Sequence, residues 1–86
     1  MIHKLKCYPQ YFEAIVKGTK TFECRKDDRG FKEGDQILLQ EYSPITETYS
    51  GREYLADITF ILNSKEFGVL PGYCVMAIKG ANINGN

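Results

Sequence analysis

The chain is poor in metal-ligating side chains. It has a single histidine, and its three cysteines, Cys7, Cys24 and Cys74, show no Cys-x-x-Cys spacing. Because a structural zinc site needs about four closely arranged nitrogen or sulfur ligands, the sequence predicts neither a metal nor another cofactor. An odd number of cysteines, each in an apolar strand-like segment, favours buried free thiols and a cytoplasmic protein over a disulfide-stabilised secreted one.

Long apolar runs and the common catalytic motifs are also absent. Lys4 and Lys6 interrupt the N-terminal segment, so no signal peptide is expected, and nothing approaches the ~18 apolar residues of a membrane span. The chain has no Gly-rich phosphate loop, no Walker motif and no Gly-x-Ser-x-Gly elbow. We therefore expect no membrane partner, and neither a P-loop nucleotidase nor a serine hydrolase of the elbow type.

Net charge is zero, with 11 basic and 11 acidic side chains. This balance argues against a protein that coats nucleic acid by bulk electrostatics. The charges are nevertheless uneven: residues 17–32 carry six basic and three acidic side chains, whereas residues 33–86 carry three basic and seven acidic ones. The basic segment is either a solvated loop or a local patch that faces an anion.

Apolar periodicity predicts one domain at residues 1–79, followed by a flexible tail at 80–86. Pro9 suits the first turn of a helix and Gly18 its C-terminal end, and residues 43–50 have no periodicity, which is typical of a loop. The fold class is α+β and mainly β: a small, closed or nearly closed barrel of five to six strands, with one main helix after the first strand. The expected strands are residues 2–7, 20–26, 36–42, 52–62 and 73–79, and the expected helix is 9–17.

The apolar faces of these elements predict a set of buried side chains. They are Phe12, Ile15, Phe22, Leu38, Ile58, Phe60, Val75 and Ile78.

The segment from Gly18 to Arg25 is the most informative part of the chain. Read as a strand with period two, Phe22 and Cys24 point to one face while Glu23 and Arg25 point to the other. An acid and a base on one strand face can hold each other and still present a fork of donors beside an acceptor. Such a pair suits a planar, hydrogen-bonding ligand such as a nucleobase or a phosphate.

The spacing Gly-x-Lys-x-x-Glu-x-Arg, formed by Gly18, Lys20, Glu23 and Arg25, resembles the signature of the ASCH family. The similarity covers roughly residues 2–79 and is closest to a small bacterial and phage subfamily without an assigned function. It implies a PUA-like β-barrel and a cleft between helix and barrel, lined by the side chains of the motif. The flanking segments that strengthen it are Pro9-x-Tyr11-Phe12, Arg29-x-Phe31, Gly34-Asp35, Gln40-Glu41-Tyr42, Tyr49-x-Gly51-Arg52 and Gly72-Tyr73.

Two further residues are expected to join this cleft as ligand-binding groups. Glu41 falls on an apolar strand face, where an unpaired carboxylate is costly, so it needs a cationic partner. Arg25 and Arg52 are the candidates for that partner. We therefore expect Lys20, Glu23 and Arg25 to converge with Glu41 or Arg52. Aromatic side chains that could stack on a base are Tyr42, Tyr49, Tyr54 and Tyr73.

Three functions remain open. The first is an RNA- or nucleotide-binding module, as the resemblance to PUA-like domains implies. The second is a small amidohydrolase of acylated cytosine nucleosides, since some ASCH proteins have this activity. Their motif has a threonine nucleophile three residues after the lysine, where this chain has Glu23, so Glu23 would activate water while Lys20 and Arg25 stabilise the oxyanion. The third is a phage or mobile-element accessory protein that binds another protein.

Overall fold

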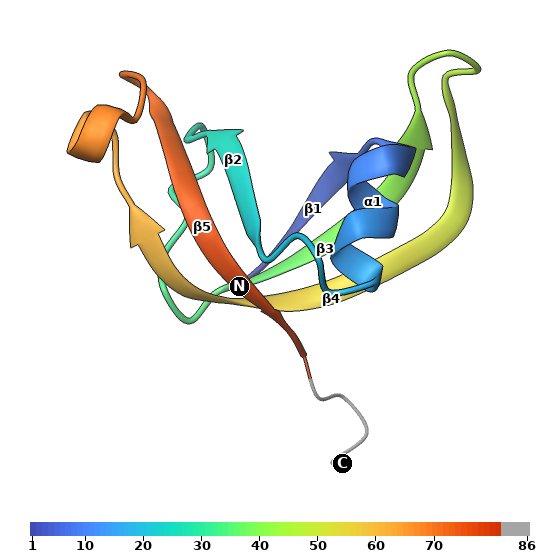
Figure 1. The fold of residues 1–86 in the computed structure, drawn as a ribbon, viewed down its shortest axis with the longest axis horizontal. Coiled ribbons are helices and arrows are strands. Elements are labelled where there is room, and N and C mark those ends of the chain that lie inside the picture. The colour runs from blue at the N-terminus through green and yellow to red at the C-terminus, as the bar shows by residue number, and fades with distance from the viewer. Residues whose placement is uncertain (82–86) are drawn as a thin grey trace.

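A computed structural model describes residues 1–81, and the strands among them form a single sheet in the order β1-β3-β4-β5-β2 (Figure 1). The mainly β fold with five strands and one α-helix after the first strand is as predicted. No helix within residues 1–81 is long and apolar enough to cross a membrane. The elements are β1 (Ile2–Cys7), α1 (Pro9–Val16), β2 (Phe22–Lys26), β3 (Gln36–Ser43), β4 (Thr48–Leu62), the short 3₁₀ turn η1 (Glu66–Gly68) and β5 (Tyr73–Gly80).

The sheet curls into a half-barrel whose two edge strands are β1 and β2 (Figure 1). Strand β1 runs parallel to β3, and β2 runs antiparallel to β5, while the long β4 curves beneath both halves. No backbone ladder joins β1 to β2 in the part of the chain that the structure describes. The barrel is therefore not closed by strand pairing, and a seam remains between the two edges.

The core lies on the concave face of this sheet, under helix α1. Phe12 and Ile15 of the helix are buried, as are Ile58 and Ile78 of the sheet, which confirms four of the predicted core positions. Phe12 occurs on an eight-residue helix that begins at Pro9, whose fixed φ and missing N–H suit the first turn. The helix therefore owes its stability to this packing, because so short a segment is marginal by itself.

Four predicted core residues are not buried. Phe22 and Phe60 are exposed, and Leu38 and Val75 are half-buried. In β2 the alternation is as predicted, but its charged face points inward. In β4 the register shifts between Ile58 and Phe60, so the extra residue turns Phe60 outward.

The cysteines are also divided between the two faces. Cys7 and Cys74 are buried, but Cys24, which alternates with Glu23, is exposed. The prediction that all three are buried is therefore wrong for Cys24.

The expected loop at residues 43–50 is a hairpin instead. Strands β3 and β4 continue to Ser43 and Thr48, and Tyr42 is paired with Tyr49 across the ladder. This arm extends beyond the core, and Ile45 at its turn is exposed. The alternation that marks a half-buried strand is therefore missing from its sequence. At the other end of the chain, β5 ends at Gly80, and residues 82–86 of the predicted tail lie outside the described residues.

His3 anchors the start of β1 to the loop before β3. It is buried, and its Nε2 lies 2.9 Å from Asp35 Oδ2. This hydrogen bond is the main reason why the pKa of Asp35 is lowered from its ordinary value of 3.8. The chain N-terminus, 3.7 Å from Asp35 Oδ1, acts in the same direction.

We predict that Asp35→Asn lowers stability at neutral pH and that this loss disappears in acid. Because the folded pKa of Asp35 lies below its unfolded value, the carboxylate stabilises the fold fully above pH 3.8 and less as the pH falls further. Urea unfolding of both proteins at a series of pH values measures the difference. A difference that does not change with pH would contradict this role.

Candidate functional site

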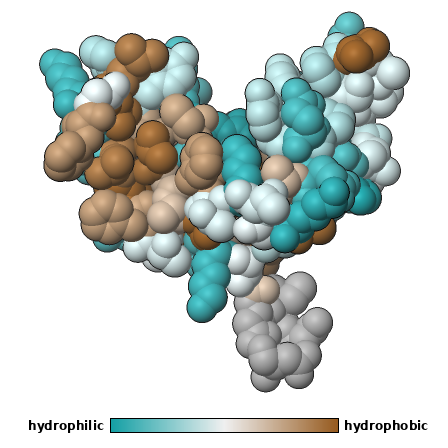
Figure 2. Space-filling view, viewed as in Figure 1, coloured by the Kyte–Doolittle hydropathy of each residue, from teal (hydrophilic) through white to brown (hydrophobic). Residues whose placement is uncertain are grey.

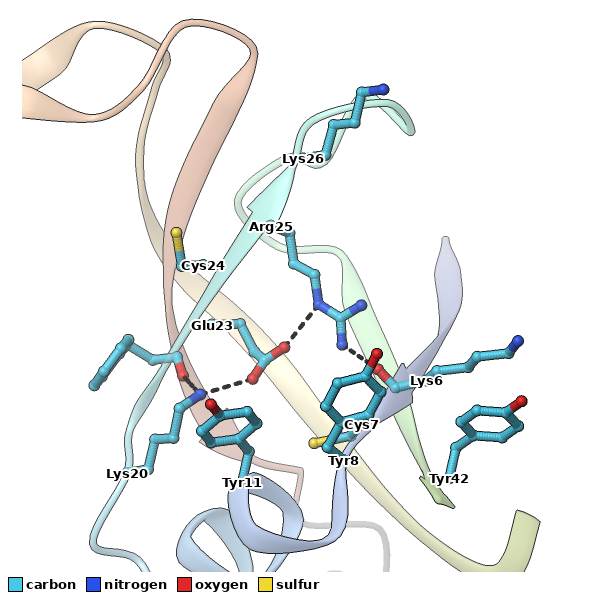
Figure 3. A pocket seen from close by; sticks show the side chains of 11 residues that line it. Lys6, Cys7, Tyr8, Tyr11, Lys20, Glu23, Cys24, Arg25, Lys26 and Tyr42 are labelled. Carbon is cyan, nitrogen blue, oxygen red and sulfur yellow. Dashed lines mark hydrogen bonds and ion pairs between the residues drawn. The ribbon is translucent and has the colours of Figure 1, made fainter. Parts of the chain in front are cut away.

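A pocket of about 530 Å³ opens at the seam between the edge strands β1 and β2 (Figure 3). We call it the seam pocket. Its volume lies within the range of small-molecule sites, roughly 300–1,000 Å³. The end of β1, the start of α1, strand β2 and one residue of β3 form its walls. The lining residues are Lys6, Cys7, Tyr8, Tyr11, Lys20, Phe22, Glu23, Cys24, Arg25, Lys26 and Tyr42.

Glu23 lies at the centre of the seam pocket and is buried. Its Oε1 accepts a hydrogen bond from Lys20 Nζ at 2.8 Å, and its Oε2 accepts one from Arg25 Nε at 2.9 Å (Figure 3). A charged donor on each oxygen offsets part of the cost of burying this carboxylate. The predicted convergence of these three residues is thus present in the structure. We call them the triad.

A tight turn brings Lys20 back toward the strand. Gly18 has a left-handed φ of 81°, and Ala14 O accepts hydrogen bonds from the backbone N–H groups of both Thr19 and Lys20. The Lys20 ammonium then reaches forward and donates to Phe22 O at 2.7 Å as well as to Glu23. The helix stop and the site are therefore built from the same few residues.

Arg25 also spans the seam. Its Nη2 donates to Lys6 O at the end of β1, so one guanidinium joins β2 to β1 (Figure 3). Arg29 Nη1 donates to Lys4 O at 2.7 Å, further along the same strand. These two arginines replace the missing backbone ladder between the edge strands. Among residues 1–81 the side-chain hydrogen bonds of Arg25 use Nε and Nη2, and none of them uses Nη1.

Three tyrosines line the pocket: Tyr8 and Tyr11 lie beside the triad, and Tyr42 lies next to Lys6 (Figure 3). Tyr42 was predicted from the sequence as a stacking residue, and Lys6 Nζ lies 4.3 Å from the centre of its ring. Tyr8 and Tyr11 were missed as ligand contacts. Tyr8 directly precedes the predicted helix and Tyr11 lies in its first turn, and this spacing of three is a signal that could have placed both on one side.

The other predicted tyrosines lie outside the pocket lining. Tyr49 meets the ring of Tyr42 edge-on at 5.0 Å, and Tyr54 packs against the core. Tyr73 is exposed at the start of β5.

The lining carries four cationic side chains, those of Lys6, Lys20, Arg25 and Lys26, against the single carboxylate of Glu23. Its formal charge is therefore +3, on a chain whose total charge is zero. The local positive patch that the sequence indicated is in part the wall of this pocket.

Glu41 and Arg52 form a second cluster, outside the seam pocket. Arg52 Nε donates to Glu41 Oε1 and its Nη2 donates to Glu13 Oε1, both at 3.1 Å. Ser50 Oγ donates to Glu41 Oε1 at 2.6 Å, and the Arg52 guanidinium lies 4.9 Å from the ring centre of Phe12. Arg52 is thus the partner that Glu41 was predicted to need.

The expectation that this pair joins the triad is wrong, because neither residue lines the pocket. Strand β3 changes register between Gln40 and Tyr42, and Arg52 lies on the hairpin arm. The cluster fastens that arm to the helix instead.

Comparison with protein-family models gives a match over residues 2–78, from the start of β1 into β5, to a family described as a domain of unknown function, DUF3850. The chain belongs to the DUF3850 family. It is also 32% identical over 66 residues to the "uncharacterized 12.9 kDa protein in GpA 3′ region" of Escherichia phage P2. That alignment covers 77% of this chain and 59% of the phage protein, so the DUF3850 chain spans little more than half of its relative's length.

The inner wall of the pocket in this DUF3850 domain includes a buried thiol. Burial, aided by the nearby charge of Glu23, raises the pKa of Cys7 to about 11. At neutral pH Cys7 is therefore protonated and contributes an apolar surface rather than a nucleophile. Among residues 1–81 no cluster of three or more His, Cys, Asp or Glu side chains is arranged to hold a metal ion.

Proposed function

We propose that the DUF3850 domain binds RNA or a nucleotide-like ligand in the seam pocket. The observation that carries the proposal is the triad, which places two charged donors around one buried carboxylate inside a pocket lined by tyrosines. Tyrosine rings offer stacking surfaces to any base, and such stacking is worth about 1–3 kcal/mol per base. Arg25 and the lysines at the pocket supply donors for phosphate oxygens.

The size of the pocket favours a single unpaired nucleotide over a duplex. A volume of about 530 Å³ holds one small-molecule unit, whereas a helical groove surface would need an extended basic face. Since the whole chain is neutral, affinity for long RNA should be modest and should fall with salt. The resemblance of the motif to ASCH domains, with their PUA-like fold, supports the same ligand class.

Titration with tRNA, short single-stranded RNA and free nucleotides at low salt tests the proposal. We expect measurable binding that Lys20→Ala and Arg25→Ala each weaken by roughly tenfold or more, because each removes a charged donor. Lys17→Ala is the matched control, since Lys17 is exposed, carries the same charge and lies outside the pocket lining. Absence of binding to every ligand, or equal losses in Lys17→Ala and Lys20→Ala, would overturn the proposal.

The amidohydrolase reading keeps one specific observation in its favour. The Glu23 carboxylate lines the pocket, where it could take a proton from a water, and Lys20 Nζ at 2.8 Å could stabilise negative charge on the reacting carbonyl. Water would add to the acyl carbon of an N4-acylated cytidine, releasing a carboxylate and the free amine. Thr21, which follows Lys20 in the sequence, is exposed and lies outside the lining of the seam pocket. It is therefore not placed to act as the threonine nucleophile of the ASCH amidohydrolases.

An assay with N4-acylated cytidines separates the two functions. Turnover that Glu23→Gln and Lys20→Ala both abolish would make the site catalytic. If the protein binds nucleotides but turns over none of these substrates, the amidohydrolase hypothesis fails and only the binding proposal remains.

A further inference from the structure

The outer face of strands β2, β5 and β4, continued by η1, is apolar and exposed. Figure 2 shows the apolar side chains gathered on this side of the molecule, over β5 and η1. We call this face the outer patch. Its large members are Phe22, Phe60, Phe67, Leu70 and Tyr73, which are 47%, 57%, 91%, 66% and 39% exposed.

The members of the outer patch are neighbours across the sheet. Phe22 of β2 and Phe60 of β4 are both paired with Ala77 of β5, so the two rings flank one small residue. In the next row Cys24 and Leu62 flank Val75 in the same way. Two adjacent rows of one sheet face are therefore without a charged side chain.

Phe67 is the most prominent member. It is 91% exposed and adopts a left-handed backbone conformation, with φ 44° and ψ 42°. Lys65, two residues earlier, also has a positive φ of 73°. Such conformations cost a non-glycine residue about 1–3 kcal/mol. Nothing within residues 1–81 buries the ring in return.

The area of the outer patch is close to what a stable interface needs. The combined exposure of its five large residues equals about three whole aromatic side chains, or roughly 600 Å² at ~200 Å² each. The largest apolar patch of an ordinary monomer is about 300–600 Å². A standard interface buries about 800 Å² on each partner. The smaller residues of the two rows add their own exposed area to the roughly 600 Å² of the large ones, which brings the total close to that value.

We propose that a second copy of the chain packs on the outer patch, so that the protein is a homodimer with sheet faces together. A two-fold axis brings the same patch of each copy together, and these rows hold no charges that would then repel. Zero net charge also leaves the two copies free of long-range repulsion. Glu23 and Arg25 project from the opposite face of β2, whereas Phe22 and Cys24 belong both to the outer patch and to the lining of the seam pocket, so this interface borders the pocket.

Sedimentation velocity between low-micromolar and near-millimolar protein tests this arrangement. We expect a monomer–dimer equilibrium that Phe67→Asp and Phe60→Asp each weaken by roughly tenfold or more, as for a residue at the centre of an interface. Ile45→Asp is the matched control, since Ile45 is also 91% exposed but lies at the turn of the hairpin arm. A monomer at every concentration would overturn the proposal, as would dimers that both Phe variants leave intact.

Cys24 provides a second readout that does not depend on sedimentation. It lies on the outer patch, whereas Cys7 and Cys74 are buried, with pKa values raised to about 11 by burial. Maleimide therefore reports on Cys24, and its labelling rate should fall as protein concentration rises. In Phe67→Asp the rate should not depend on concentration. Labelling of the unmodified chain that is independent of concentration, or binding of phosphatidylcholine vesicles by a monomer, would instead assign the patch to another occupant.

Discussion

Replacing Arg25 by methionine is expected to abolish ligand binding and to lower the free energy of unfolding by about 1–3 kcal/mol. The substitution removes the guanidinium that donates to Glu23 Oε2 and to Lys6 O. It therefore breaks the link that Arg25 makes between Glu23 on β2 and the end of β1. Glu23 then keeps a single charged partner in a buried position. Urea unfolding and nucleotide titration on the same preparations measure both effects.

Lys20→Met is the comparison for this prediction. The ammonium of Lys20 donates hydrogen bonds to Phe22 O and Glu23, both within three residues, and lies over the rings of Phe22 and Tyr11. Arg25 instead spans 19 residues to donate to Lys6 O on β1. We therefore expect Lys20→Met to impair binding as strongly but to destabilise the fold less than Arg25→Met. If Arg25→Met binds RNA and nucleotides like the unmodified chain, the triad is a structural ion pair and the proposed function fails.

Phe12→Ala should have the largest effect on stability, about 3–5 kcal/mol. Phe12 is 1% exposed, fixes α1 against the sheet and underlies the Arg52 guanidinium. A domain of this size has roughly 5 kcal/mol of stability in all, so the variant should be largely unfolded at room temperature. Far-UV circular dichroism with urea unfolding provides the measurement.

Alanine substitutions at two exposed positions of α1 serve as controls for Phe12→Ala. Tyr11→Ala should leave stability nearly unchanged but weaken nucleotide binding, because Tyr11 is half-exposed and lines the seam pocket. Val16→Ala should change neither, since Val16 is exposed and outside the pocket lining. Phe12→Ala protein as stable as Val16→Ala would show that α1 does not depend on this core contact.

Local patterns predicted the elements well where one face is buried and the other is not. The alternation at residues 2–7 matches β1 residue for residue, and Pro9 and Gly18 bracket the helix that the structure contains. The hairpin arm escaped prediction, because a ribbon exposed on both faces leaves no apolar period.

The sequence by itself determined where the strands fall along the chain and that the helix follows the first strand. It also determined the pairing of Glu23 with Arg25, through strand alternation. These features depend on neighbours in the chain, which local propensity and periodicity describe. Which face of β2 turns inward was decided only by the tertiary structure, since alternation separates two faces without saying which is covered. The register shift that exposes Phe60, the seam bridged by Arg25 and the separation of Glu41 and Arg52 from the triad likewise depend on contacts between distant strands.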